Sequence, residues 1–91
     1  MYQIEITNKF RRDVRRCQKQ GKDMARFKAV SQLLEQGKAL PIHNRDHNLT
    51  GNWRGYRECH LAPDWLLIYE IDEIAKIITF DRMGSHSDLL G

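Results

Sequence analysis

The sequence has no long hydrophobic run and few cysteines. No apolar stretch approaches the ~20 residues that a membrane-spanning helix needs, and the first residues alternate apolar with polar, unlike a secretory signal. Cys17 and Cys59 are too few and too far apart for a zinc ribbon or a disulfide framework. We therefore expect a soluble protein in a reducing cytoplasm, with no membrane association.

Proline and glycine are also scarce, with two and six residues in a chain of 91. The composition of 41% hydrophobic and 30% charged residues is typical of a folded globule and excludes a disordered or collagen-like chain. The length falls short of what a second core needs. We expect a single domain spanning residues 1–91, so that one site carries the function.

Charge is distributed unevenly along the chain. Residues 1–45 hold eleven lysines and arginines against four acids, a net charge of +7, whereas residues 46–91 hold four against eight, a net charge of −4. The whole chain has a net charge of only +3. This asymmetry predicts a basic face beside a chemically distinct region and suggests a polyanionic partner.

The first half predicts a strand followed by two helices. Apolar and polar residues alternate from Tyr2 to Thr7, which predicts a half-buried strand of about five residues. Thr7 or Asn8 can cap a helix that ends at Gly21, and Asp23 can cap a second helix that ends at Gly37. The apolar stripes of these helices are Phe10, Val14 and Cys17, then Met24, Phe27, Val30, Leu33 and Leu34. The short connection predicts an antiparallel helical hairpin.

The second half predicts a long loop and then strands. Residues 38–52 lack any period and collect turn-forming residues, and a loop of that length is usually functional. Strands are expected at 53–61, 65–71 and 75–81, and residues 82–91 read as a loop or a single helical turn. The order β-α-α-β-β-β predicts an α+β fold, with a mostly antiparallel twisted sheet of about four strands and the helical hairpin on one face.

The residues suited to catalysis follow the long loop. His47 lies in the loop, His60 ends a predicted strand, Asp64 lies in the next turn and His86 lies near the end of the chain. In the predicted sheet, the turn after His60 and the segment after the last strand can meet. Three imidazoles and one carboxylate can then converge.

Two chemistries use such a set of residues. Neutral imidazoles and a carboxylate are suitable ligands for a divalent metal, and the same groups can act as general acid and base at neutral pH. No metal-binding helical motif is present, because His43 and His47 have the i, i+4 spacing but lie in the loop. The residues alone leave both chemistries open, and we adopt the metal-free reading with no cofactor.

Acid-base cleavage of RNA by its 2′-hydroxyl needs a base, an acid and a cation for the charge on the phosphate. His60 or Asp64, His86 and Arg82 can fill these positions. An aspartate has an ordinary pKa near ~3.9, so Asp64 either has a raised pKa or holds an imidazole in the required tautomer. The sequence leaves this choice, and the assignment of acid and base, open.

A long spaced pattern in the second half resembles a known family. The residues Asp46 to Tyr69 match D-H-x-L-x-G-x-W-x-G-x-R-x-x-H-x-x-x-D-W-x-L-I-Y, which is similar to the core of the YafQ-type toxins of the RelE/ParE superfamily. The residues Arg82 to Gly91 resemble the ending R-x-G-x-H-x-x-L-F-G of that family. The lengths of the basic helical region and loop also agree, so the resemblance covers nearly the whole chain.

The resemblance implies the toxin of a bacterial type II toxin-antitoxin system. Such a toxin is a small endoribonuclease that cuts mRNA in the ribosomal A site and is neutralised by a cognate antitoxin. The family's catalytic positions fall on His47, His60, Asp64 and His86. Trp65 falls at a position near the active site, and Leu90 stands where the family often has phenylalanine. These two are therefore expected beside the substrate.

The basic first helix agrees with this reading. A toxin that acts on ribosome-bound mRNA must dock on ribosomal RNA, and lysines and arginines supply much of such binding by neutralising phosphates. The residues expected to do so are Lys9, Arg11, Arg12, Arg15, Arg16 and Lys19. The alternatives are a ParE-like toxin that binds a protein target without nuclease chemistry, and a metal-dependent nuclease or metal-binding module. The histidines disfavour the first of these.

Overall fold

The computed structural model of the protein describes residues 1–89. Its elements, in chain order, are β1 (Gln3–Ile6), α1 (Asn8–Lys19), α2 (Met24–Glu35), the 3₁₀ turn η1 (Ile42–Asn44), β2 (His47–Asn48), the 3₁₀ turn η2 (Gly51–Trp53), β3 (Arg57–Ala62), β4 (Trp65–Asp72), β5 (Ile77–Gly84) and α3 (His86–Leu89). None of the helices in this part of the chain is long and apolar enough to cross a membrane.

The strands form one sheet in the order β1-β5-β4-β3-β2. The β1 strand is parallel to β5, and the other neighbouring pairs are antiparallel. The predicted α+β class, its order of elements and its mostly antiparallel sheet are thus confirmed. The fifth strand is the two-residue β2, which lies inside the region expected to be a loop.

Local signals set the limits of both long helices as predicted. The Thr7 hydroxyl accepts a hydrogen bond from the Phe10 amide, and the Asp23 carboxylate accepts one from the Ala25 amide, so each side chain caps a helix. Gly21 adopts a positive φ of 76° beyond α1, a conformation that glycine takes without steric cost.

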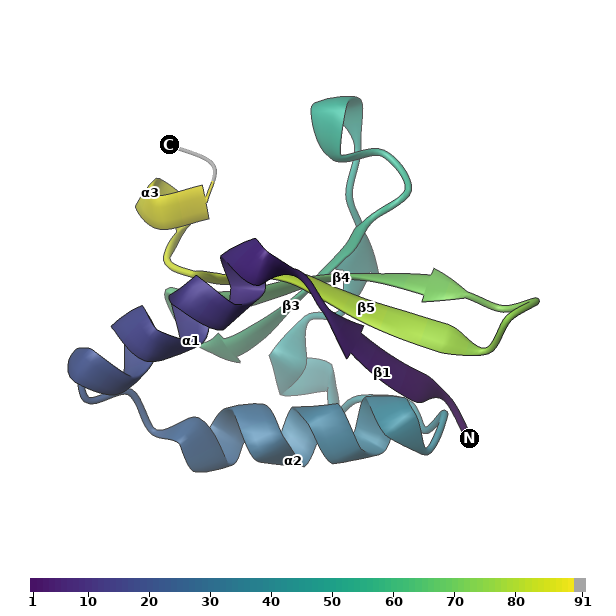
Figure 1. The fold of residues 1–91 in the computed structure, drawn as a ribbon, viewed down its shortest axis with the longest axis horizontal. Helices are drawn as coiled ribbons and strands as arrows, with labels where there is room; N and C mark the ends of the chain where they lie inside the picture. Colours follow the sequence, from purple (N-terminus) through teal and green to yellow (C-terminus); the bar gives the residue numbers. More distant parts are fainter. Residues whose placement is uncertain (90–91) are drawn as a thin grey trace.

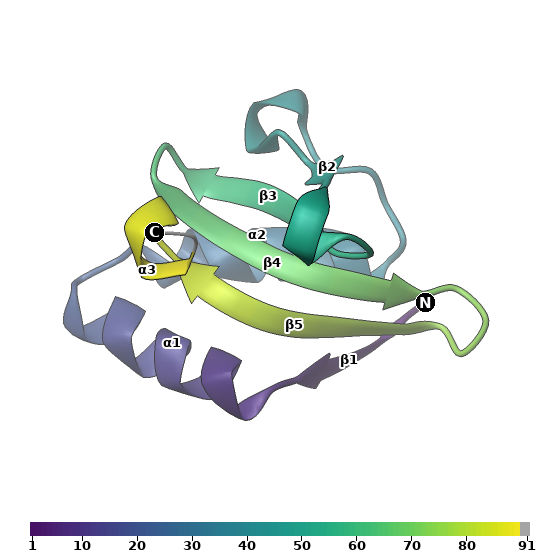
Figure 2. The same cartoon turned by 90° about the horizontal axis from the view of Figure 1, so that it is seen from above.

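The α2 helix lies under one face of the sheet, α1 runs beside the edge of the sheet at β5, and α3 lies on the side opposite α2 (Figures 1 and 2). The α1 helix packs mainly against β5, whereas α2 packs against β3. Phe10 of α1, Phe27 of α2 and Phe80 of β5 form a triangle with ring centroids 5.5–5.7 Å apart, which joins both helices to the sheet. The hairpin is therefore held by the sheet beneath it.

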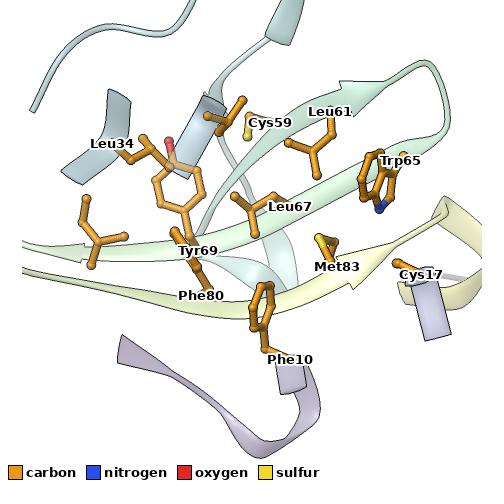
Figure 3. Close-up of a cluster of buried hydrophobic side chains, with 12 residues drawn as sticks. Phe10, Cys17, Leu34, Cys59, Leu61, Trp65, Leu67, Tyr69, Phe80 and Met83 are labelled. Carbon is orange, nitrogen blue, oxygen red and sulfur yellow. The ribbon is translucent and has the colours of Figure 1, made fainter. Parts of the chain in front are cut away.

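The core lies between this helical layer and the sheet (Figure 3). Its side chains come from the helices and from alternate positions of the three central strands. The buried members are Phe10, Cys17, Val30, Leu34, Cys59, Leu61, Trp65, Leu67, Tyr69, Ile78, Phe80 and Met83. Intervening positions on β3, β4 and β5, one residue away, face the other side of the sheet.

The structure corrects one predicted strand boundary. The strand expected from residue 53 begins at Arg57, because η2 occupies Gly51–Trp53 and Gly55 adopts a φ of 95°. A turn with positive φ interrupts the extended backbone that the apolar and aromatic residues suggested. This turn belongs to a loop that projects from the sheet on the same side as α3 (Figure 1).

An irregularity between β4 and β5 decides which side chains share a face. Tyr69 pairs with Phe80, but Ile68 pairs with Arg82, which leaves Asp81 as an extra residue in β5. The extra residue resets the alternation, so that Phe80 and Met83 both reach the core. Arg82 consequently lies on the face of the sheet opposite the hydrophobic core, here called the open face.

Candidate active site

The register of the sheet aligns the candidate site residues across the open face. His47 on β2 pairs with Glu58 on β3, Glu58 pairs with Ile68 on β4, and Ile68 pairs with Arg82 on β5. Directly paired residues share a face, so these four side chains form one row. His60 lies two residues beyond Glu58 and begins the next row on the same face.

Three imidazoles lie side by side along this face. The ring centroid of His60 is 6.5 Å from that of His47 and 6.0 Å from that of His86. His60, in the middle, is the least exposed of the three, with 15% of its side chain accessible. The structure therefore brings together three segments that are far apart in the sequence, and it places their rings within reach of one substrate group.

A buried carboxylate connects two of these imidazoles. Glu58 Oε1 lies 3.5 Å from His47 Nε2 and 3.7 Å from His60 Nε2, and only 5% of the Glu58 side chain is exposed. Glu58 Oε2 is buried without a hydrogen-bond partner among the described residues. A buried carboxylate is costly unless cations or proton donors face it, and the imidazoles of His47 and His60 are the groups that the structure places beside Glu58.

The sequence interpretation did not single out Glu58. The alternation of β3 contained the necessary signal, because residues two apart in a strand share a face and His60 lies two residues further on.

Asp64 holds His86 at the end of the row. The Asp64 Oδ1 atom accepts a hydrogen bond from the His86 backbone amide at 3.1 Å and lies 2.8 Å from Nδ1 of the His86 ring. The backbone hydrogen bond and then the ring contact hold the pKa of Asp64 below its ordinary value. Asp64 is therefore ionised at neutral pH, and it selects the His86 tautomer with a proton on Nδ1, which leaves Nε2 free.

The loop before β2 orients His47 in a similar way. Nδ1 of His47 lies 2.6 Å from the carbonyl oxygen of Arg45, an atom that can only accept, so Nδ1 carries a proton and Nε2 faces Glu58. Arg45 adopts a left-handed conformation with a φ of 49°, which is unfavourable for an arginine. The structure holds this strained residue directly beside the site.

A polar network fixes the residues on both sides of His47. Arg57 donates from Nη2 to Asp46 Oδ2 at 3.0 Å and from Nη1 to Asn48 Oδ1 at 2.6 Å. The buried Tyr69 hydroxyl donates to Asp46 Oδ1 at 2.5 Å. Burial, followed by the hydrogen bond to Asp46, raises the pKa of Tyr69, which keeps this hydroxyl protonated as a donor. The network joins the loop to β3 and β4 from the core side of the sheet.

Arg82 is held by a second buried carboxylate. Asp13 on α1 binds Arg82 Nε at 2.8 Å and Nη2 at 3.2 Å, and it also accepts the Met83 amide at 2.9 Å. Burial acts to raise the pKa of Asp13, but hydrogen bonds from Arg82, Met83 and Arg16 outweigh it and hold that pKa below its ordinary value. With 22% of its side chain exposed and Nη1 outside these bonds, Arg82 can still present one nitrogen to a ligand.

Arg16 differs from the other basic residues of α1. Its guanidinium donates to Asp13 Oδ1 at 2.8 Å and to the Met83 carbonyl at 2.6 Å, and it lies 3.7 Å from Asp88. Lys9, Arg11, Arg12, Arg15 and Lys19 are exposed, as an RNA-docking face requires. A Cβ atom at Gly84 would lie 2.5 Å from Arg16 Nη2, so the close approach of this arginine requires glycine there.

Trp65 and Leu90 are the other two residues expected beside the substrate. Trp65 is 1% exposed and packs in the core, on the face opposite Glu58 and His60, so its ring offers no stacking surface in this structure (Figure 3). Its side chain supports the turn that carries Asp64. Leu90 lies outside the described residues.

The metal-binding alternative was also considered. Within residues 1–89, no group of three or more His, Cys, Asp or Glu side chains is arranged so that it could hold a metal ion. The imidazoles and carboxylates of the site can by themselves transfer protons.

Comparisons with known proteins agree with this fold. The family model described as bacterial toxin of type II toxin-antitoxin system, YafQ, matches residues 2–91. The chain is 40% identical over 89 residues to the mRNA interferase toxin YafQ of Escherichia coli strain K12, covering 97% of this chain and 95% of that protein. It is also similar to a chain of the E. coli DinJ-YafQ complex, with a TM-score of 0.90, 39% identity and all of both chains covered.

A metal-bound toxin from Helicobacter pylori has a TM-score of 0.93 and 37% identity, and the match covers 99% of this chain and 100% of that one. The family match over nearly the full length and the identity to the E. coli toxin lead to one conclusion. This chain belongs to the YafQ family of bacterial toxins of type II toxin-antitoxin systems.

Proposed function

We propose that this protein is an mRNA-cleaving toxin that inhibits translation by metal-free general acid-base catalysis on the ribosome. The observation that carries the proposal is the ionised Asp64 beside His86, with His60 and His47 next to it on the open face. Proton transfer in both directions needs two groups within reach of one phosphodiester, and this row of imidazoles supplies them. The relatives named mRNA interferases support the same activity.

In the proposed reaction, the ribose 2′-hydroxyl attacks the adjacent phosphorus and gives its proton to a base. The bond from phosphorus to the 5′-oxygen breaks, and that oxygen takes a proton from an acid. His86 is the acid in its imidazolium form: Asp64 holds the Nδ1 proton, and the proton on Nε2 is the one given to the 5′-oxygen. His60, supported by Glu58 and His47, is the base. The remaining nitrogen of Arg82 faces the charge that develops on the phosphate.

Docking on the ribosome uses the exposed basic side chains of α1. Phosphate neutralisation by lysines and arginines does not depend on base sequence, so it suits a surface of ribosomal RNA. The participating residues are Lys9, Arg11, Arg12, Arg15 and Lys19. Arg16 contributes less, because its guanidinium is already paired with Asp13 and Asp88. The mRNA then reaches the open face.

The partner that silences the toxin is a cognate antitoxin with an acidic or apolar segment. The E. coli DinJ-YafQ complex supports such a partner for this chain.

The cytoplasm is the proposed location, because ribosomes and mRNA meet there. The wider placement in the RelE/ParE superfamily, as a single domain over residues 1–91, rests on the sequence pattern. The histidine row favours the nuclease over the ParE-like alternative.

The test is primer extension on a defined mRNA in a translation extract. We expect cleavage with the wild type only when ribosomes are present, and a loss of at least about a hundredfold for His86→Gln, because general acid catalysis contributes on that order. The matched control is Lys28→Gln, on the exposed surface of α2. Cleavage that survives His86→Gln unchanged contradicts the mechanism. An absence of wild-type cleavage contradicts the nuclease activity itself.

A further inference from the structure

A cavity of about 310 Å³ lies beside the proposed site and shares His60 with it. Its other walls are Arg26 from α2, His43 from η1, Arg45 from the following turn, and the end of β3 from Leu61 to Pro63. The sequence interpretation treated His43 as a plain loop residue and singled out neither arginine as a site residue. The cavity volume falls at the lower end of the range for small-molecule sites, about 300–1,000 Å³.

The walls of this cavity are tied to the strand that carries His60. Asn44 is buried and donates from Nδ2 to the His60 carbonyl oxygen at 2.7 Å, which fixes η1 against β3. Arg26 donates from Nη1 to the Leu61 carbonyl oxygen at 3.4 Å, which ties α2 to the same strand. The Arg26 guanidinium and the η1 turn are therefore positioned before any ligand arrives, which reduces the ordering cost of binding.

The charge of the lining is positive. Two guanidinium groups and two imidazoles face the cavity, and none of the described residues that line it is a carboxylate. The nearest acid to Arg26 is Asp23, in an exposed ion pair with a separation of 3.9 Å, and such pairs contribute little. A planar guanidinium fork binds phosphate oxygens through two parallel hydrogen bonds. The chemistry of this lining therefore selects an anion with several oxygens.

We propose that this cavity is a subsite for a phosphate of the RNA strand next to the scissile bond. The inference rests on the proposed nuclease function, which supplies a strand running past His60. Because His60 forms one wall, a phosphate held by Arg26 and Arg45 places the neighbouring nucleotide against the imidazole row. Arg45 also connects the subsite to the site directly, since its carbonyl oxygen orients the His47 ring. The subsite thereby helps to align the strand for cleavage.

The binding test uses nuclear magnetic resonance of the purified wild-type protein with adenosine 5′-monophosphate, adenosine 3′-monophosphate, adenosine and inorganic phosphate as probes. We expect at least one monophosphate to shift the His43 ring and the Arg26 and Arg45 Nε–H signals, and adenosine to leave them unchanged. The variant Arg26→Gln/Arg45→Asn should weaken monophosphate binding about tenfold. Asparagine tolerates the left-handed conformation of Arg45, so the fold is retained. The control Lys28→Gln/Lys38→Gln removes the same charge from exposed positions outside the cavity.

The functional arm measures mRNA cleavage by both double variants in a translation extract. We expect about a tenfold loss for Arg26→Gln/Arg45→Asn relative to its control, and an intermediate loss for Arg45→Asn alone. Equal cleavage by the two double variants overturns the subsite. Binding of inorganic phosphate as tight as that of the nucleotides also overturns the subsite. A double variant that cleaves mRNA normally but no longer binds the antitoxin overturns it as well, and would assign the cavity to a protein partner. Failure of the wild type to cleave overturns the proposed function instead, because nucleotide binding is measured without cleavage.

Discussion

Arg16 and Met83 are joined across the molecule, because Nη2 of the arginine on α1 donates to the Met83 carbonyl oxygen at 2.6 Å. Met83 lies on the strand that leads to His86, and the same guanidinium lies 3.7 Å from Asp88 in α3. Asp88 in turn accepts the Ser85 amide at 3.1 Å. A residue of the basic helix thus supports the segment that carries the His86 imidazole, in addition to any contact with RNA.

The substitution Arg16→Lys separates these two contributions. Lysine keeps the charge but cannot reach Asp13, Met83 and Asp88 together from one ammonium group. We expect a loss of about 1 kcal/mol in unfolding free energy, measured by urea denaturation, and about a tenfold loss of mRNA cleavage. Arg15→Lys, at an exposed neighbouring position, should change neither quantity. If Arg16→Lys cleaves as well as the wild type, Arg16 contributes only its charge.

The hydroxyl of Tyr69 provides a second test, on the His47 side of the site. Tyr69→Phe leaves Asp46 with one partner fewer in a part-buried position, which we expect to cost about 1 kcal/mol of stability and to loosen the loop around His47. The readouts are chemical denaturation and the line width of the His47 ring signals. Tyr2→Phe is the matched control, since its hydroxyl bonds Glu73 at an exposed place. Unbroadened His47 signals in Tyr69→Phe would show that the network does not position this ring.

Asp64→Asn removes the charge that faces His86 while keeping an oxygen that can accept from Nδ1. We expect mRNA cleavage to fall at least about tenfold. The pKa of Asp64 is lowered in the folded state, so its contribution to stability is present above the ordinary value of 3.8 and is lost as pH falls through the lower folded value. Urea denaturation should therefore separate variant and wild type at pH 7, and the difference should disappear as pH falls well below 3.8. A stability difference that persists at the lower pH contradicts this ion pair.

The pKa of Asp81 is shifted in the opposite direction from that of Asp64. Burial and then the hydrogen bond and charge of Glu70 raise the pKa of Asp81 from 3.8 to about 7. The folded state therefore binds the proton more tightly than the unfolded state, and stability falls as pH rises from about 4 to about 7. We expect Asp81→Asn to raise the unfolding midpoint, and to raise it more at pH 8 than at pH 5, as measured by thermal denaturation. A larger effect at pH 5 than at pH 8 would contradict this sign.

The local elements and the catalytic residue types were predictable from the sequence. The caps at Thr7 and Asp23 and the stop at Gly21 act through backbone atoms a few residues away, so the limits of α1 and α2 follow from neighbouring residues. The distinctive spacing of His47, His60, Asp64 and His86 singled out the candidate site.

Other features depend on contacts between distant segments. Asp13 is buried because it meets Arg82 and the Met83 amide, which lie at the other end of the chain. Trp65 faces the core because of its place in the strand register, whereas the family resemblance implied a position beside the substrate. Neither outcome leaves a signal in the residues immediately around it.

The sequence by itself determined the two helices, the strand-rich second half, the basic first helix and the set of imidazoles and carboxylates. Only the tertiary structure decided that Glu58 lies between His47 and His60, that Arg16 supports the His86 segment, and that Arg26 and Arg45 share a cavity with His60. The physical reason is the distance along the chain over which each kind of interaction acts. Caps and hydrophobic periods act over a few residues, whereas strand register and the extra residue Asp81 in β5 set which side chains from distant segments meet.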